Sequence, residues 1–281
     1  MNKLIYTLLI ALQVTAFQTN AEEFHSPRTA ALGGAGHAAP LLNDAIYLNP
    51  SYIALIPTYS FSSTYLSHRD ADGGSGRILN FSLQDGRNKA LKGGAAYTAK
   101  DKQKTINLAT AYRLGDAISV GAGYKYLWTE LESGAHEISA SSSFVLSDEF
   151  QLSLILHNAI QTDYGRENGL LRSIIIGSKV NLKDILIFYI DPHFIPSVSS
   201  GYKRGYNIAI ELVLLKDVFF RSGIFKNAPV PFMANALGEG QGLGIGWVGG
   251  RTSLDYAYKK VNRTSTLRSG FSHSLGLTLY F

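Results

Sequence analysis

Long runs of alternating apolar and polar residues constrain this chain more than any other feature. In residues 118–128, every second position is apolar or aromatic: Ile118, Val120, Ala122, Tyr124, Tyr126 and Trp128. The same period of two returns in residues 105–114, 206–214, 242–247 and 253–259. Because successive side chains of a β-strand point to opposite faces, this pattern predicts strands with one face toward an apolar phase.

A soluble sandwich of two sheets also alternates, so length, charge and aromatic placement have to decide. The runs are about 9–11 residues long, which suits a tilted transmembrane strand, whereas strands of soluble proteins average about 5–6 residues. The other face carries Arg113, Lys125, Glu211 and Asp255, which need water that a barrel lumen could supply. Tyrosine and tryptophan gather toward strand ends, as in membrane-interface girdles. The prediction is an all-β transmembrane barrel.

Composition excludes several other classes. The 281 residues contain no cysteine and no run of about 18 apolar residues, which excludes disulfide scaffolds, thiolate metal sites and helical membrane bundles. The net charge of +5 is small and scattered, so nucleic acid is not expected as a partner. The seven histidines have no ligand spacing and no G-x-S-x-G motif occurs, so we predict no catalytic residue, metal or cofactor.

The first 21 residues have the features of a secretory signal peptide. One cation, Lys3, precedes an apolar run that is too short to span a bilayer, and Ala21 suits cleavage before Glu22. We therefore expect export to the bacterial outer membrane.

Counting the polar turns gives the number of strands. Six tight turns lie near residues 85–88, 115–116, 147–149, 183–184, 216–217 and 249–251, and longer connections alternate with them. Six short turns separate seven hairpins, which predicts a 14-stranded up-and-down antiparallel barrel over residues 58–281. Its strands should begin near Tyr59, Arg77, Leu91, Thr105, Ile118, Glu137, Phe150, Arg172, Ile185, Tyr202, Val218, Gly242, Thr252 and Phe271.

The last strand ends on an aromatic residue. Leu275, Leu277, Leu279 and Phe281 share one face, and Gly276 lies between the first two on the other face. The order of Gly276, Leu279 and Phe281 resembles the C-terminal signal with which outer-membrane proteins engage the barrel-assembly machinery.

Residues 22–57 do not alternate, and they carry a family resemblance. The runs Gly33-Gly34-Ala35-Gly36 and Asp44-Ala45, with Tyr47 and Asn49-Pro50 after them, are similar to the N-terminal region of the FadL-like long-chain fatty-acid transporters of the outer membrane. That family includes the PorV-type branch of secretion proteins. The resemblance implies a plug, or hatch, inside a 14-stranded barrel that passes hydrophobic molecules. Ser51 departs from the alanine usual there, and the connections are short for a fatty-acid transporter.

The chemistry of the segment supports a plug independently. Gly33, Gly34 and Gly36 let the backbone pack close to a wall, and Asn49-Pro50 can turn the chain. A flexible exposed arm is the alternative, but it would leave Leu41, Leu42, Ile46, Leu48, Ile53, Leu55 and Ile56 in water. We take the five glycine, asparagine and proline positions as plug and gating residues.

Two places are candidates for a lateral opening in the wall. Pro192 interrupts an apolar run and cannot donate to a ladder, so it marks either a strand end near Asp191 or a break in pairing. Gly93-Gly94 lies in the third predicted strand, where the resembling transporters have a kink.

The predicted function is passive transport of a small, fatty-acid-like hydrophobic molecule. One alternative is a plugged barrel that acts as a scaffold for secreted or surface proteins, and the other is a lipid-modifying enzyme. Basic residues in the outer loops suggest lipopolysaccharide as a further partner. An apolar lumen would favour transport, a solidly filled lumen a scaffold, and a Ser/His/Asp cluster at the outer rim an enzyme.

Overall fold

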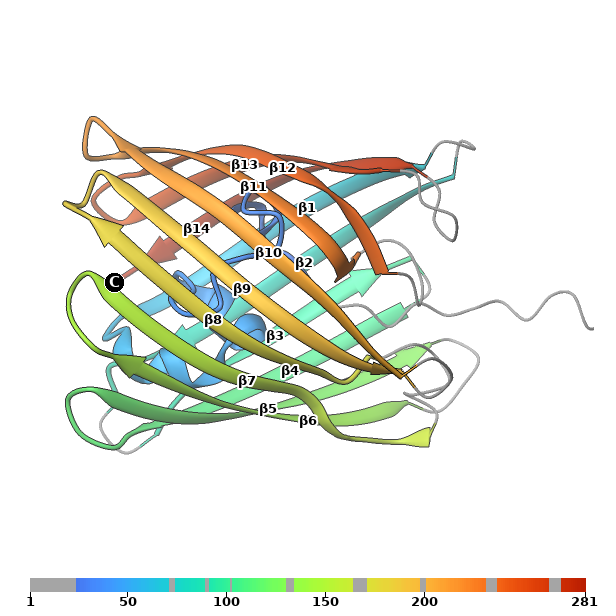
Figure 1. Ribbon diagram of the computed structural model, residues 1–281, viewed down its shortest axis with the longest axis horizontal. Helices are drawn as coiled ribbons and strands as arrows, with labels where there is room; N and C mark the ends of the chain where they lie inside the picture. Colours follow the sequence, from blue (N-terminus) through green and yellow to red (C-terminus); the bar gives the residue numbers. More distant parts are fainter. Residues whose placement is uncertain are drawn as a thin grey trace, which may run out of the picture.

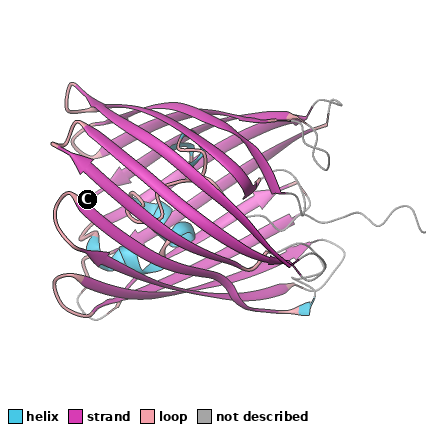
Figure 2. Ribbon diagram, viewed as in Figure 1, coloured by secondary structure: helices cyan, strands magenta, loops and turns pink. Residues whose placement is uncertain are grey.

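The computed structural model describes residues 24–70, 74–88, 91–101, 103–129, 134–163, 171–197, 201–230, 237–262 and 269–281. Within these ranges the chain forms a closed barrel of fourteen antiparallel strands, each paired with its sequence neighbours, and β1 pairs with β14 to close it (Figures 1 and 2). The strands are β1 (Tyr59–Asp70), β2 (Ser75–Asp85), β3 (Lys92–Lys100), β4 (Gln103–Arg113), β5 (Ile118–Thr129), β6 (Ala135–Val145), β7 (Phe150–Gln161), β8 (Ser173–Leu182), β9 (Leu186–Ser197), β10 (Gly201–Leu214), β11 (Val218–Pro229), β12 (Leu237–Val248), β13 (Thr252–Val261) and β14 (Gly270–Tyr280).

The predicted strand number and topology are confirmed. The largest difference in a boundary is at β12, which begins at Leu237 and not at Gly242. Gly238 and Gly240 extend its ladder to Ala228 and Phe225 on β11. Glycine has no side chain to mark a strand, so the alternation of apolar residues starts later than the pairing does.

The outer surface of the barrel is an apolar belt. Alternate strand residues are exposed and large, among them Phe61, Leu83, Leu108, Ile190, Ile245 and Leu277. A belt of this extent around a closed barrel faces lipid, because closure leaves no open sheet edge in the wall. The protein is therefore a membrane barrel. No helix in the described part of the chain is long and apolar enough to cross a membrane.

The two ends of the barrel differ. The short turns and the C-terminus lie at one end, on the left in Figure 1, and the longer connections lie at the other. Short turns face the periplasm and longer loops face outward in barrels of this kind, so the end with the longer connections is called the outer end below.

Residues 24–57 lie inside the barrel (blue in Figure 1). They form four short helices: α2 (Pro27–Ala31), η1 (Leu42–Asp44), α3 (Ala45–Leu48) and η2 (Pro50–Leu55). Helix α2 contacts β12 and β13, and η2 contacts β4 and β5, so the segment reaches opposite parts of the wall. We call residues 24–57 the N-terminal segment.

Candidate functional site in the barrel lumen

Helix α2 is set by local signals at both ends. Ser26 caps it, because its hydroxyl accepts a hydrogen bond from the backbone N–H of Thr29 at 3.2 Å, and Pro27 occupies the first turn. Gly33 and Gly34 end it with φ angles of 65° and 96°, which side-chain-bearing residues rarely adopt. These glycines reverse the chain and direct it across the lumen.

Glycines on the inner face of the wall make room for the segment. A Cβ at Gly242 would lie 2.1 Å from the Ala30 carbonyl oxygen, and one at Gly223 would lie 2.2 Å from that of Leu32. On the other side, a Cβ at Gly121 would lie 2.3 Å from the backbone nitrogen of Ser51. Two backbones can approach this closely only where neither has a side chain between them. The alternating glycines of β12 are thus a surface shaped for α2.

A buried charge network joins the segment to the wall. Arg28 contacts the Glu211 carboxylate at 3.3 Å and donates to the Tyr189 hydroxyl at 2.8 Å. Arg221 contacts the same carboxylate at 2.5 Å and reaches Asp255 at 2.5 Å. The lumenal acids Glu211 and Asp255 are therefore paired with arginines, whereas the sequence suggested that water would solvate them.

Burial and ion pairing shift the pKa of Arg28 in opposite directions. Burial alone would lower the pKa of the Arg28 guanidinium, but Glu211, Tyr189 and Asp44 together outweigh burial and raise it. Burial raises the pKa of Asp44, although Arg28 opposes this shift. The Asp44 carboxylate accepts a hydrogen bond from the Thr29 hydroxyl at 3.2 Å. Arg28 thus stays charged and ties the segment to β9 and β10.

Asn49 and Pro50 form a second anchor. The Asn49 amide donates to the His37 carbonyl and to the Ser143 hydroxyl, both at 2.8 Å. Pro50 starts η2 and lies against Gly123, where a Cβ would be 3.2 Å from the proline ring. Ser51 donates its backbone N–H to the Ser141 hydroxyl at 2.9 Å. The wall serines thereby satisfy the polar groups of this turn.

Gly36 and His37 meet a single carboxylate of the wall. Asp191 on β9 accepts the backbone N–H groups of Gly36 at 2.8 Å and His37 at 3.0 Å. The His37 Nδ1 lies 2.8 Å from the same carboxylate oxygen, and its Nε2 is buried without a hydrogen-bond partner. This corner of the segment therefore depends on one residue of β9. We call the contact between Asp191 and Gly36-His37 the latch.

The wall beside the latch has an interrupted ladder. β9 runs through Pro192 to Ser197, so a strand end near Asp191 is not observed. Its pairing with β10 is continuous, but its pairing with β8 passes from Ile175–His193 to Ser178–Ile190 with no pairs between them. Proline lacks the N–H that such a pair would need. The gap therefore lies at Pro192 and the latch residue next to it.

Gly93 and Gly94 lie in unbroken ladders with both β2 and β4. A Cβ at Gly94 would be 2.7 Å from the Ile46 side chain, so this glycine makes room for α3. In the closed wall, the presence of glycine at position 94 is thus explained by its packing against α3.

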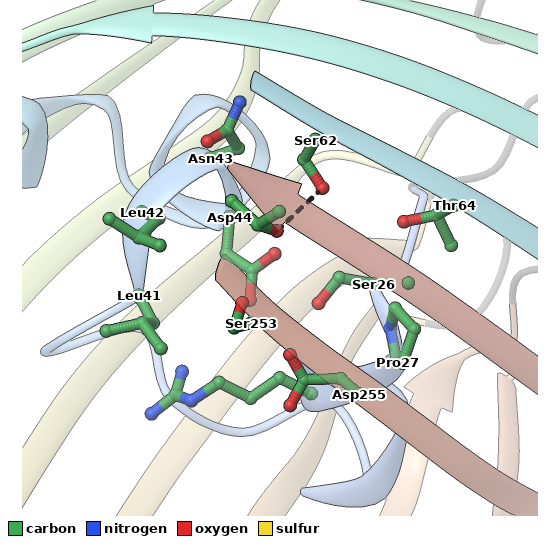
Figure 3. A pocket seen from close by; sticks show the side chains of 13 residues that line it. Ser26, Pro27, Leu41, Leu42, Asn43, Asp44, Ser62, Thr64, Ser253 and Asp255 are labelled. Carbon is green, nitrogen blue, oxygen red and sulfur yellow. Dashed lines mark hydrogen bonds between the residues drawn. The ribbon is translucent and has the colours of Figure 1, made fainter. Parts of the chain in front are cut away.

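A small polar crevice separates the segment from β1, β13 and β14 (Figure 3). Asp44, Ser62, Ser253 and Asp255 line it, and its volume of about 30 Å³ holds roughly one water molecule. The crevice is too small for an organic solute.

Several inward positions in the outer half of the wall are apolar. They are buried and lie on eight different strands. They are Leu66, Ile78, Leu127, Ile155, Ile175, Ile195, Phe225 and Val261. A water-filled porin lumen is polar, so these side chains suit an apolar solute.

The remaining predicted residues lie at the chain ends. Gly276 faces inward beside Pro27, and Leu279 and Phe281 lie on the lipid-facing side of β14. The Phe281 backbone N–H donates to the Tyr59 carbonyl at 2.9 Å, which completes closure. The predicted signal peptide lies outside the described residues. No cluster of three or more metal-ligating side chains occurs in the described part of the chain.

Sequence reasoning missed the residues that hold the segment: Arg28, His37, Tyr189, Asp191 and Arg221. Asp191 ends the apolar run of residues 185–190 and lies on the inward face of its strand, which is a usable signal. Its partners lie about 155 positions away along the chain, so no local pattern connects them.

Comparison with solved structures places the fold among outer-membrane channels. The R. pickettii toluene transporter TbuX aligns with a TM-score of 0.67 over 92% of this chain and 99% of its own, at 11% identity. The CymD monoaromatic hydrocarbon channel aligns with a TM-score of 0.64 over 91% of this chain and 97% of its own, at 12% identity. The P. putida toluene transporter TodX aligns with a TM-score of 0.63 over 93% of this chain and 99% of its own, at 11% identity.

No family model matches the chain, and no curated protein matches it in sequence. The structural likeness confirms the FadL-like barrel as the fold of this chain, which the N-terminal runs predicted. It is the fold of an outer-membrane β-barrel.

Proposed function

We propose that the protein is an outer-membrane channel through which small hydrophobic molecules diffuse passively. The observation that carries the proposal is the set of apolar side chains on the inward face of the outer half of the barrel. An apolar lining lowers the free energy of an apolar solute and does little for an ion or a sugar. The neighbours described as toluene transporters and as a monoaromatic hydrocarbon channel support the same class of solute.

The N-terminal segment acts as the plug in this proposal. It is buried, it contacts opposite parts of the wall, and Gly33, Gly34 and Gly36 let it approach that wall. Asn49 and Pro50 hold its second turn. A segment anchored at both sides would obstruct ions while its rearrangement lets a solute pass. Export by residues 1–21, and assembly through Gly276, Leu279 and Phe281, belong to the same proposal.

The gap between β8 and β9 is the exit that we favour. Pro192 and Ile176 border it on the lipid side, and Gly177 and Asp191 border it on the lumenal side. Release of the latch would let the two strands separate at the only point where the wall lacks ladder pairs within the described β8–β9 interface. The unbroken ladders at Gly93 and Gly94 make that alternative route less favourable.

Uptake by intact cells tests the transport proposal. A host that lacks its own hydrophobic channels would express the full chain, and entry of radiolabelled toluene would be measured with galactose as the polar control. We expect faster toluene entry with unchanged galactose entry. Ile175→Asp should slow toluene about tenfold, a barrier increase of about 1.4 kcal/mol, whereas Ser173→Asp, at another inward position, should have less effect. Equal rates with and without a folded barrel would reject the proposal.

Cysteine cross-linking tests the exit separately, since the chain has no native cysteine. The pair Ile176→Cys and Pro192→Cys would bridge the gap, and Ile190→Cys with Ile208→Cys would bridge an intact β9–β10 pair as the control. Oxidation of the first pair should stop uptake and reductant should restore it. Continued uptake through the cross-linked gap would place the exit elsewhere while leaving transport intact.

A further inference from the structure

Cations occupy outward positions at the outer end of six strands. They are Arg69 on β1, Arg77 on β2, Lys104 on β4, Arg204 on β10, Lys226 on β11 and Lys260 on β13. In the described strands, Glu239 on β12 is the only aspartate or glutamate at an outward position in the outer half. The outer rim therefore presents a positive charge toward the surrounding lipid.

The opposite end of the barrel does not share this bias. Its turns mix both signs, and some of them form ion pairs: Arg113 with Asp116 at 3.6 Å and Arg87 with Asp85 at 4.0 Å. With a net charge of only +5, the whole chain is not strongly basic. The outward cations are thus a property of one membrane face.

Two of these arginines share a hollow across β14, β1 and β2. Its volume is about 460 Å³, and the outward residues that line it are Tyr65, Ser67, Arg69, Ser75, Arg77 and Phe271. Arg69 pairs with Phe271 on one side and with Ser75 on the other, and Arg77 pairs with Ser67. The two guanidinium-bearing residues are therefore diagonal neighbours on adjacent strands.

Diagonal neighbours lie within reach of long side chains, and like charges there repel. No ion pair joins Arg69 or Arg77 to a carboxylate of the described residues, so an anion between them would relieve the repulsion. The Asp101 carboxylate also borders the hollow and offsets part of the charge. Arginine forks match phosphate oxygens in geometry, and the serine hydroxyls can donate to sugar or phosphate oxygens.

We propose that this hollow binds the phosphate of a phosphorylated glycolipid in the outer leaflet. Its position decides the source of the phosphate. Phe271 pairs with Arg69, and farther along β1 Tyr65 pairs directly with the lipid-facing Leu79 and Leu275. A lipid held here places its headgroup on the arginines and its acyl chains along the belt, which a free phosphate ion cannot do. The site is independent of any transported solute.

Binding of diphosphoryl lipid A to the full-length barrel in detergent tests the proposal, with native mass spectrometry as the readout. The variant Arg69→Gln with Arg77→Gln should bind about tenfold more weakly, and Asp101→Asn should bind more tightly. The matched control, Arg204→Gln with Lys226→Gln, removes the same charge from β10 and β11 and should change binding little. A heat-modifiable gel shift would confirm that each variant remains a closed barrel.

Three results would overturn the proposal. An equal loss in the control would mean that charge around the whole rim, and not the hollow, attracts the lipid. Unchanged binding in the Arg69/Arg77 variant would remove the site. Inorganic phosphate that competes as strongly as the lipid itself would identify the free anion as the ligand.

Discussion

At the scale of single residues, the lumen holds charges that a membrane barrel would not bury without partners. Arg28 and Arg221 face Glu211 and Asp255, so two cations balance two carboxylates. Removing one member of a buried pair leaves the other unpaired and costs more than the pair contributes. The network therefore fixes where the N-terminal segment sits, because Arg28 on that segment pairs with Glu211 on the wall.

A double-mutant cycle on Arg28 and Glu211 tests this role. Arg28→Met should lower the free energy of unfolding by about 3–5 kcal/mol, because Glu211 keeps only Arg221 and Tyr189. Combining it with Glu211→Gln should cost less than the sum of the single changes. Urea unfolding in detergent would measure this. Arg113→Met at the exposed pair with Asp116 is the control and should cost at most about 1 kcal/mol. Additive effects of the two changes would contradict the coupling.

His25 makes the segment sensitive to acid. Burial lowers the pKa of His25 well below its usual range, and Lys259, 3.2 Å away, lowers it further. A released segment exposes His25, whose pKa then returns to about 6.5. The stabilisation from neutral His25 is therefore complete above about pH 6.5 and decreases as the pH falls below it.

Single-channel recording would show the loss of this stabilisation as a higher open probability in acid. Because one proton is taken up, the open probability should rise by at most about tenfold per pH unit. His25→Gln should match the wild type near pH 7 and respond less to acid. Identical pH profiles for the two proteins would show that another group controls the response.

At the scale of elements, the sequence predicted the wall better than its contents. Each strand repeats a period of two over its own length, so strand number and facing could be read locally. The bounds of β12 could not, because its first half is glycine at every second position. The contacts of the N-terminal segment could not either, since Arg28 and Glu211 are 183 positions apart. Inward glycines were visible in the sequence as small residues, but only the fold shows what they accommodate.

The contact between α2 and β12 gives a prediction for Gly242. Gly242→Val would place side-chain atoms against the Ala30 backbone, which cannot move aside as a flexible side chain could. We expect about 1–3 kcal/mol of strain, released by displacement of α2 from the wall. Trypsin cleavage after Arg28 would then become faster, while the heat-modifiable shift of the barrel stays. Gly250→Ala, in a turn where a Cβ meets no atom within 4 Å, is the control. Protection of Arg28 in the valine variant would contradict the packing role.

At the scale of the whole molecule, the wall and the N-terminal segment divide the work. The wall is closed by backbone pairing that includes β1 with β14, so it needs no contents to remain a barrel. The segment contributes helices too short to be stable alone, and the wall orders them. A barrel of fourteen strands is wide enough to leave a passage if its inner face carries small residues. Here the glycines that receive the segment would become the walls of that passage.

Deleting residues 24–57 tests this division directly. The barrel should still assemble and shift on heating, because its ladders are intact. The emptied lumen should conduct ions in planar bilayers in long, stable openings, whereas the full chain should stay closed or flicker. A chain with Arg28→Met and Asp191→Asn, which loosens both attachments without removing the segment, should show intermediate, brief openings. Equal conductance of the deleted and full chains would mean that the lumen is obstructed by the wall itself, and the plug would have no role in closing it.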